Sequence, residues 1–552
     1  MLSLLASCRR PPQVDAPDRL DALAIDVPAP EDAPDAAAPE DLPEPPLPPM
    51  DAAAEAPPGR STLDLPLRDS WAAVNTWNDR MEGEYSAFVA RLGEAIAQRR
   101  CRRLDRCLGD PSANTLFDAS SDRRLSLTVD CADLPYILRA YFAFKRRLPF
   151  GYVARVRGYG DDPRYMLRVR PSRWRAWTDF RTARAALRAM VDDVHSGMYR
   201  VSPDVPGGDL YPPRIDRDAV RPGTAYYDPN GHVLVVIEVR PDGTVYLIDG
   251  HPDGSLTYKR FGEAFAIGTR SLGGGFQNFR PLRWDGEHLT RAGNDEIPGF
   301  DGDSQWSPAA WQPAVPDPDA GARARVGYHQ WVRHRLASAG AVVDPVLDLR
   351  EQVASLCRDV ADRAEAVDAS LAAGIQRQPH PAALPWNIYG TTGDWETWST
   401  PSRDARLKAA VRELHDAVAA SASDPALLER MRAAWREEIA RPGCETRYVN
   451  SAGAPVTLPL ETVLDRLFSL SFDPYHCVEL RWGAPPGSAE LSTCTDDPTR
   501  RGWYRAEQRL RNQIDRNYGV ATPLTAGPEA CAGRRPQATA RAASLTVDPA
   551  AG

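Results

Sequence analysis

The stretch from residue 9 to residue 60 constrains the fold most, because it cannot contribute to a hydrophobic core. It holds 14 of the chain's 51 prolines, 12 acidic and 4 basic side chains, and no aromatic residue. A segment of this composition buries too little apolar surface to offset the entropy lost on ordering. We therefore expect a disordered tether over residues 9–64, with the folded part of the 552-residue chain beginning after it.

The tether also carries the formal net charge of −8. Outside residues 9–60, the remaining 63 acidic and 63 basic side chains cancel. A chain that binds nucleic acid through its folded body typically carries a basic surface. The charge distribution therefore predicts no nucleic-acid partner.

The first eight residues end in Leu5-Ala6-Ser7-Cys8, with small residues before the cysteine. This pattern resembles the lipobox of bacterial lipoproteins, in which the cysteine becomes the lipid-carrying N-terminus. The resemblance implies a partial signal at residues 1–8, lipidation at Cys8, and a place in the cell envelope, in the periplasm or on the outer surface. No run of the sequence approaches the roughly 18 apolar residues of a spanning helix. We expect membrane contact only through the lipid.

The periodicity of apolar residues divides the remaining chain into two domains. Residues 65–300 alternate helical and strand patterns, which predicts an α+β domain, and residues 301–325 are a Pro- and Asp-rich linker. Residues 326–520 favour an α-helical domain, and residues 521–552 a loose tail. Helices are predicted over 71–100, 130–150, 349–376, 402–420, 425–440, 460–470 and 503–518, and strands over 232–239, 244–248 and 255–260.

Three residues of the first domain can carry chemistry together. Cys131 begins a predicted helix, His232 begins a strand, and Asp249 ends the next strand. A helix N-terminus and a nearby imidazole lower the pKa of a thiol, which makes it a nucleophile. The imidazole itself needs a carboxylate or amide on its other nitrogen for orientation. The backbone N–H of Cys131 can also stabilise an oxyanion.

This order of motifs resembles the transglutaminase-like superfamily, within the papain-like cysteine peptidase group. The motifs are VDCADLPYILRAYF around Cys131, NGHVLVVIEV around His232 and VYLIDGHP around Asp249. The resemblance covers roughly residues 65–290 and implies a papain-like domain whose central antiparallel sheet packs on the Cys-bearing helix. Two positions depart from the family pattern: His232 precedes Val, not Ala-Trp, and Asp249 precedes Gly, not Pro.

The partner of His232 remains open at this stage. A two-residue turn at Asp242-Gly243 places Asp249 opposite Val236, about 13 Å along the strand from His232. A longer turn or a bulge brings the carboxylate closer. We favour Asp249 from the family order, and the alternatives are Asp253 and Asp228. His251 is interpreted as an exposed loop residue.

Nine cysteines are present. With Cys8 and Cys131 set aside, the others allow three disulfides and one free thiol, which suits an exported protein. Cys101 and Cys107 are the local pair, and Cys357 is interpreted as a buried thiol; pairing among Cys444, Cys477, Cys494 and Cys531 cannot be derived from spacing. No HExxH, paired CxxC or Walker motif occurs, so the sequence predicts no metal and no cofactor.

The resemblance implies a tethered thiol acyl-transfer enzyme that acts on a peptide or isopeptide bond. Cys131 attacks the carbonyl, His232 acts as base and then acid, and Asp249 orients His232. Water as acceptor gives a cysteine peptidase, which we favour, and an amine gives a transglutaminase. The expected partner is a peptide or protein, with cell-wall peptide as one candidate. The alternative is a non-catalytic lipoprotein that uses the fold as a binding or scaffold module.

Overall fold

The computed structural model describes residues 71–514, apart from Ser120, Ser271, residues 312–319, Trp386, Gly390 and Ala422. For Pro308 and residues 320–326 only the backbone is described. Cys8, the tether predicted over residues 9–64 and the tail predicted over residues 521–552 therefore lie outside the described residues, as does Cys531.

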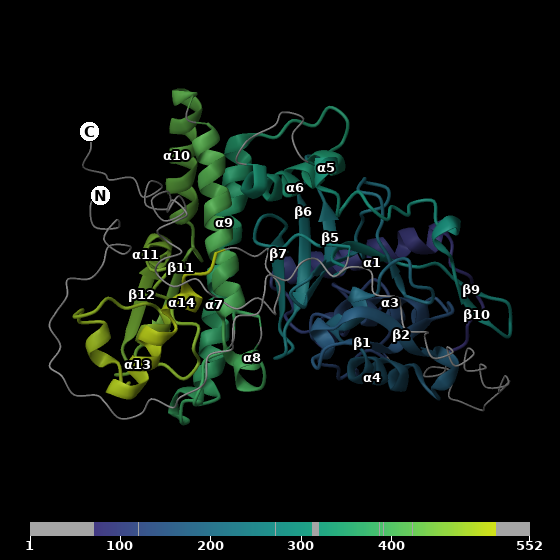
Figure 1. The fold of residues 1–552 in the computed structure, drawn as a ribbon, viewed down its shortest axis with the longest axis horizontal. Helices are drawn as coiled ribbons and strands as arrows, with labels where there is room; N and C mark the ends of the chain where they lie inside the picture. The colour runs from purple at the N-terminus through teal and green to yellow at the C-terminus, as the bar shows by residue number, and fades with distance from the viewer. Residues whose placement is uncertain are drawn as a thin grey trace, which may run out of the picture. The chain divides into compact units, whose positions relative to one another are not determined.

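A six-stranded antiparallel sheet lies at the centre of the first half of the described chain (Figure 1). Its strand order is β3-β8-β4-β5-β6-β7. The predicted strands after His232 appear as a meander, because turns at Pro241–Gly243 and Pro252–Gly254 interrupt apolar runs. The strands are β3 (Leu210–Tyr211), β4 (Ala225–Asp228), β5 (His232–Val239), β6 (Val245–Gly250), β7 (Leu256–Arg260) and β8 (Gly275–Phe279).

Helices cover both faces of this sheet. Val233 and Val235 of β5 share one hydrophobic core with α1 (Asp79–Ala97), α2 (Leu104–Leu108) and α3 (Asp133–Lys145). Leu234 and Val236 point to the opposite face, where they share a second core with α6 (Ala320–Leu336). Residues 326–336, which the sequence places in the helical domain, therefore pack against the sheet.

The helix predicted over residues 71–100 begins at Asp79, later than its apolar pattern suggests. The Asn78 side chain accepts a hydrogen bond from the Met81 N–H and caps the helix. Residues 71–78 are not helical, and the indoles of Trp71 and Trp77 donate to the carbonyls of Leu148 and Pro149. The two tryptophans thus bind this segment to the residues that follow α3.

Smaller elements complete this half of the molecule. A two-stranded ribbon precedes the sheet, and a short hairpin follows it. These elements are β1 (Gly151–Tyr159), β2 (Leu167–Ala176), α4 (Ala183–Asp193), β9 (Leu282–Trp284), β10 (Leu289–Arg291) and α5 (Pro308–Trp311).

The second half is mainly helical, with α7, α9 and α10 side by side (Figure 1). Its core also includes a hairpin that the sequence pattern did not predict, β11 with β12. The elements are α7 (Pro345–Ala372), α8 (Asp394–Trp398), α9 (Pro401–Ala420), α10 (Pro425–Ile439), β11 (Glu445–Val449), β12 (Pro455–Pro459), α11 (Leu460–Asp465), α12 (Val478–Arg481), α13 (Pro498–Ala506) and α14 (Gln508–Arg511). The described chain is thus α+β, a central antiparallel sheet followed by a helical region.

Buried ion pairs join the helical region to the sheet. Lys259 of β7 lies 2.7 Å from Asp359 and 2.9 Å from Asp362, both on α7. The neighbouring Arg260 bridges Asp348 of α7 and Glu413 of α9. The two halves therefore share a charged contact along β7.

Three disulfides link described cysteines: Cys101–Cys107, Cys357–Cys444 and Cys477–Cys494. The local pair predicted at Cys101 and Cys107 is confirmed. The interpretation of Cys357 as a free buried thiol is wrong, because α7 brings it to Cys444 at the start of the β11–β12 hairpin. Cys131 is the one free cysteine among the described residues.

None of the helices in the described ranges is both long and apolar enough to cross a membrane.

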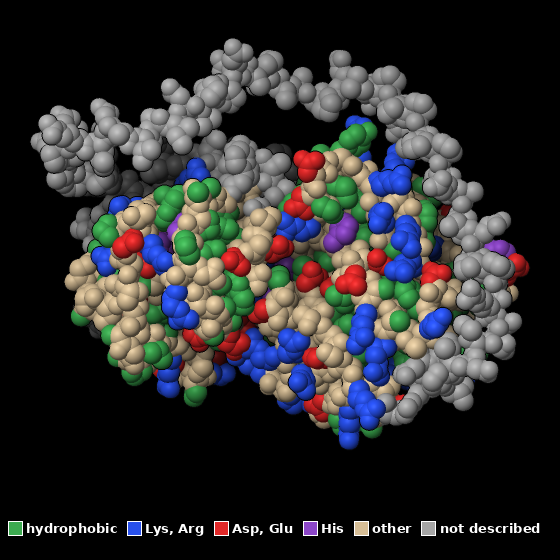
Figure 2. Space-filling view, turned by 90° about the horizontal axis from the view of Figure 1, so that it is seen from below, with side chains coloured by type: hydrophobic (Ala, Val, Ile, Leu, Met, Phe, Trp, Pro, Cys, Tyr) green, Lys and Arg blue, Asp and Glu red, His purple; other side chains and the backbone are tan. Residues whose placement is uncertain are grey.

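One face of the molecule displays basic and acidic side chains intermingled (Figure 2). This mixture agrees with the balanced charge of the chain outside residues 9–60.

Candidate active site

Cys131 lies in the turn that begins α3. The carboxylate of Asp130 accepts hydrogen bonds from the backbone N–H groups of Ala132 and Asp133, and Asp133 in return accepts from the N–H of Asp130. This reciprocal pairing caps the helix. It leaves the N–H of Cys131 without a hydrogen bond to another described residue. That N–H is therefore available to a ligand beside the half-buried thiol.

A β-bulge sets the register that brings His232 and Asp249 together. Val239 pairs with Val245 across a five-residue turn, and Ile237 is an extra residue between the pairs Glu238–Tyr246 and Val236–Leu247. The longer turn and the bulge each shift the register by one residue. Continued along the strands, this register places Asp249 opposite Leu234, two residues from His232 and on the same face.

The two side chains meet as this register requires. Nε2 of His232 lies 2.8 Å from Oδ2 of Asp249, and the carboxylate is fully buried. The predicted alternatives are engaged elsewhere: Asp253 accepts from Ser255 in its own turn, and Asp228 accepts from Asn230 and Ala266. Among the three carboxylates, Asp249 is the one hydrogen-bonded to the imidazole.

The thiol occupies a gap in the strand ladder. β5 and β6 pair only as far as Val235 and Ile248, so the outer edge of β5 is free beside His232. The Cys131 sulfur lies 3.9 Å from the Gly231 carbonyl oxygen and also contacts the Val233 N–H. The thiol therefore lies against the backbone on both sides of His232.

Hydrogen bonds extend behind the carboxylate. The Thr257 hydroxyl donates to Oδ1 of Asp249, and Nε2 of His251 lies 3.2 Å from the same hydroxyl. Because that hydroxyl already uses its proton, His251 must donate to it. His251 is buried and belongs to this chain of hydrogen bonds, so its interpretation as an exposed loop residue is wrong.

The electrostatics of the resting site favour a neutral thiol at Cys131 and a neutral imidazole at His232. Burial raises the pKa of Cys131 well above its usual value, and the carboxylates of Asp130 and Asp249 raise it further. Burial also lowers the pKa of His232, although the hydrogen bond that it donates to Asp249 acts in the opposite direction. The expected thiolate is therefore not the resting form, because burial and nearby carboxylates outweigh the helix N-terminus. Although burial alone would raise it, the two histidines hold the pKa of Asp249 well below its usual range.

Residues from distant parts of the sequence border the site. Gly231 has a positive φ of 93°, and a Cβ there would lie 2.9 Å from the ring of Tyr165, between β1 and β2. The Tyr165 hydroxyl donates to the carbonyl of Tyr389, and Arg164 pairs with Glu396 at 2.5 Å. Sequence reasoning missed this border, since no local pattern connects residues 389–396 with a site formed before residue 250.

The arrangement provides the groups that acyl transfer needs. Nδ1 of His232 makes no hydrogen bond to another described residue, the Cys131 thiol included. The free N–H of Cys131 is a donor that could stabilise an oxyanion formed at the thiol. Groups able to hold a metal occur among the described residues only in the helical region, at Asp473, His476 and Glu507 and at a disulfide-bonded pair.

Family models, curated proteins and solved structures were compared with the chain, and none of them matches it.

Proposed function

We propose that the protein is a thiol acyl-transfer enzyme with Cys131 as nucleophile, His232 as general base and acid, and Asp249 as the residue that orients His232. The observation that carries the proposal is the placement of the thiol against Gly231 and Val233 while His232 is hydrogen-bonded to Asp249. A papain-like fold is part of this proposal, supported by the Cys-bearing helix against an antiparallel sheet.

The reaction starts from a neutral pair. His232 Nδ1 takes the thiol proton as the sulfur attacks the carbonyl carbon, and the imidazolium is stabilised by Asp249. The Cys131 N–H donates to the oxyanion of the tetrahedral intermediate. Collapse breaks the bond to the leaving amine, which takes the proton from His232, and a thioester remains on Cys131. Water then attacks the thioester and gives a proton to His232. Collapse of this second intermediate breaks the C–S bond and releases the acid, and the Cys131 sulfur takes the proton back from His232.

Hydrolysis of a peptide or isopeptide bond is the favoured outcome, since it needs no second specific substrate. An amine in place of water would give transamidation through the same thioester. The rival from another class is a non-catalytic binding or scaffold module. The enzyme is favoured by a specific hydrogen bond in which the His232 imidazole donates to the fully buried Asp249 carboxylate, next to the free thiol among the described residues.

The place of action is proposed from the sequence. A lipid on Cys8 and the acidic tether would hold the enzyme at the cell envelope, where cell-wall peptide is a candidate substrate. Three disulfides among the described cysteines are consistent with an oxidising compartment. Replacing Cys8 with Ser should move the protein from the membrane fraction to the soluble fraction, and unchanged fractionation would refute the anchor.

A generic acyl donor tests the nucleophile without knowledge of the substrate. We expect p-nitrophenyl acetate to acylate the protein with a burst of one p-nitrophenolate per chain, and mass spectrometry to locate the acetyl group on Cys131. Cys131→Ala should lose the burst and keep the near-ultraviolet circular dichroism of the folded protein. A burst that survives this substitution, or an unmodified Cys131 after exposure to the ester, would overturn the proposal.

A further inference from the structure

The helical region contains a buried group of ligand-type side chains that the proposed acyl transfer does not use. One ligand atom each from Asp473, His476 and Glu507 lies within 4.8 Å of the others, and all three residues are 0% exposed. We call these residues the Asp473 group. They come from the loop before α12 and from the residue that follows α13.

Two buried atoms of the Asp473 group make no hydrogen bond to any described residue. Nδ1 of His476 lies 2.7 Å from Asp496, and because an ionised carboxylate only accepts, Nδ1 carries the proton. Nε2 of His476 then presents its lone pair; it lies 3.5 Å from Oδ2 of Asp473 and has no hydrogen-bond partner among the described residues. Oε2 of Glu507 is likewise buried and unpartnered there. Buried acceptors without a donor are costly unless a cation or proton lies between them.

Neighbouring side chains hold both His476 and Asp473 in place. An imidazole whose Nδ1–H is held by a carboxylate is the usual arrangement of a metal-binding histidine, with Nε2 facing the ion. Asp473 is held by His380. Nε2 of His380 lies 2.8 Å from Oδ2 of Asp473, and its Nδ1 contacts the Pro381 carbonyl. Asp473 is therefore held in place from outside the group.

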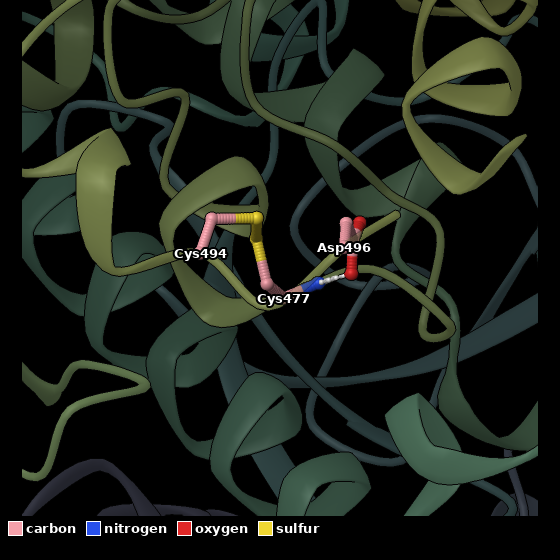
Figure 3. A group of neighbouring side chains, drawn as sticks. All are labelled: Cys477, Cys494 and Asp496. Carbon is pink, nitrogen blue, oxygen red and sulfur yellow. Dashed lines mark hydrogen bonds between the residues drawn. A yellow bond between two sulfur atoms is a disulfide. The ribbon is translucent and has the colours of Figure 1, made fainter. Parts of the chain in front are cut away.

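The disulfide Cys477–Cys494 lies next to Asp496, the carboxylate that orients His476 (Figure 3). Asp496 accepts a hydrogen bond from the Cys477 N–H at 3.0 Å. Because Cys477 directly follows His476, the same short segment supplies the imidazole and holds the carboxylate that orients it. Although Cys477, Cys494 and Asp496 also lie close together, both sulfurs are bonded to each other and offer no thiolate. The ligand set is therefore the Asp473 group and not the cysteines.

The nearby guanidinium groups do not donate to Oε2 of Glu507. Arg511 donates to Oε1 of Glu507, Arg363 pairs with Asp404, and Arg481 donates to the Ser471 carbonyl and the Ser370 hydroxyl. Oε2 of Glu507 therefore remains open to a metal ion.

The size of the group also suits an ion. Because its three atoms lie within 4.8 Å of one another, a position within about 2.8 Å of each exists. Side-chain shifts of less than about 1 Å would then reach the roughly 2.0–2.2 Å of zinc–nitrogen and zinc–oxygen bonds. One imidazole with two carboxylates is a donor set for zinc or manganese.

We propose that Asp473, His476 and Glu507 bind one divalent metal ion of the zinc or manganese type, with Asp496 and His380 as positioning residues. The ion connects the loop before α12 to the end of α13. It therefore stabilises the helical region and takes no part in the chemistry at Cys131.

Metal analysis of the full chain tests the proposal. The protein carries Cys131→Ser, because a thiol beside an imidazole also binds zinc, and no reductant is present, so that Cys477–Cys494 stays closed. After EDTA treatment and removal of the chelator, we expect added Zn²⁺ or Mn²⁺ to rebind at one equivalent per chain and to raise the melting temperature. Failure of both ions to bind, with no change in melting temperature, would overturn the proposal.

Variants separate a metal site from a protonated hydrogen-bond network. Glu507→Gln and His476→Gln should lose the bound metal, and Asp496→Asn should weaken binding by about 10- to 100-fold. His288→Gln, at an exposed histidine, is the matched control and should bind as before. If the three variants bind the metal as the control does, the Asp473 group is not the site. If a variant does not fold, the titration of the Cys131→Ser chain decides.

Discussion

Replacing Asp249 with Asn isolates the charge behind the proposed base. Asn keeps the size of the side chain and can still accept a hydrogen bond from His232, but it carries no charge. When His232 takes the thiol proton, a positive charge forms next to a fully buried carboxylate 2.8 Å from Nε2. At a charge separation near 4 Å and an effective dielectric of about 20, their attraction is about 4 kcal/mol.

The partial exposure of His232, 17% of its side chain, reduces this value, so we expect a loss of about 3–4 kcal/mol. At 1.36 kcal/mol for each tenfold change in rate, acylation by p-nitrophenyl acetate should slow by about 10²- to 10³-fold. The pH profile gives an independent reading. Without the carboxylate the imidazolium is less stable, so the pKa of His232 falls further, and the acid limb of the profile moves to lower pH.

The burst of p-nitrophenolate measures this loss at saturating ester, with the rate of Cys131→Ala subtracted as background. Asp253→Asn is the matched control, because Asp253 is an exposed turn residue whose carboxylate accepts hydrogen bonds from Ser255. Its burst should be unchanged. An Asp249→Asn protein that acylates at the wild-type rate would refute the reasoning, as would an equal loss in the control.

Three further predictions follow from the geometry. Gly231→Ala should lower the free energy of unfolding by at least about 1–2 kcal/mol in a urea titration, because its φ of 93° is unfavourable for Ala and its Cβ would meet Tyr165; an unchanged midpoint would contradict this. Burial and Asp130 raise the pKa of Asp133 to about 9, so its contribution to stability is complete below about pH 4 and is lost as pH rises towards 9, at up to about 1.4 kcal/mol per unit. Asp133→Asn should therefore be more stable than the wild type at pH 8, with the difference shrinking at pH 4; a pH-independent difference would contradict the assignment. Lys259→Met should destabilise the protein by up to about 3 kcal/mol, because Asp359 loses its buried cation while Asp362 keeps Arg99 and Arg102; an unchanged melting transition would contradict this.

The order of Cys131, His232 and Asp249 along the chain was accessible from the sequence, but their geometry was not. Alternating apolar residues and Pro-Asp-Gly turns indicate the strands, whereas the register depends on one extra residue at Ile237. That side chain packs against Gly93 of α1, where a Cβ would lie 2.5 Å away. The bulge therefore reflects a contact over more than a hundred residues, which no local pattern contains.

The direction in which the pKa of the Cys131 thiol is shifted could be predicted only in part from the sequence. Asp130 is adjacent to Cys131 in the sequence, and a residue that caps a helix also places its negative charge beside the first turn. This signal was present and predicts a higher pKa for the thiol. Burial, the larger cause, depends on the sheet and could not be derived from spacing.

The disulfide and side-chain contacts of the helical region were the hardest to predict from the sequence. Cys357 and Cys444 are 87 residues apart, and nothing in their spacing distinguishes a disulfide from a buried thiol. The same is true of the Asp473 group, whose members are brought together by the packing of α13 against the loop before α12. In the sequence, nothing distinguishes the histidine and the two carboxylates of the Asp473 group from ordinary polar residues.

The position of α7 along β7 has a consequence for how the chain can be divided. An edge strand with free N–H and C=O groups is a template for pairing with another chain, unless it is short or covered. One edge of the sheet, β3, has only two residues, and the other, β7, is covered by α7. A fragment ending near residue 300 would retain Cys131, His232 and Asp249 but leave β7 uncovered, and we expect it to self-associate by size-exclusion chromatography. The helical region thus prevents the sheet from self-associating through β7, independently of any ion that it binds.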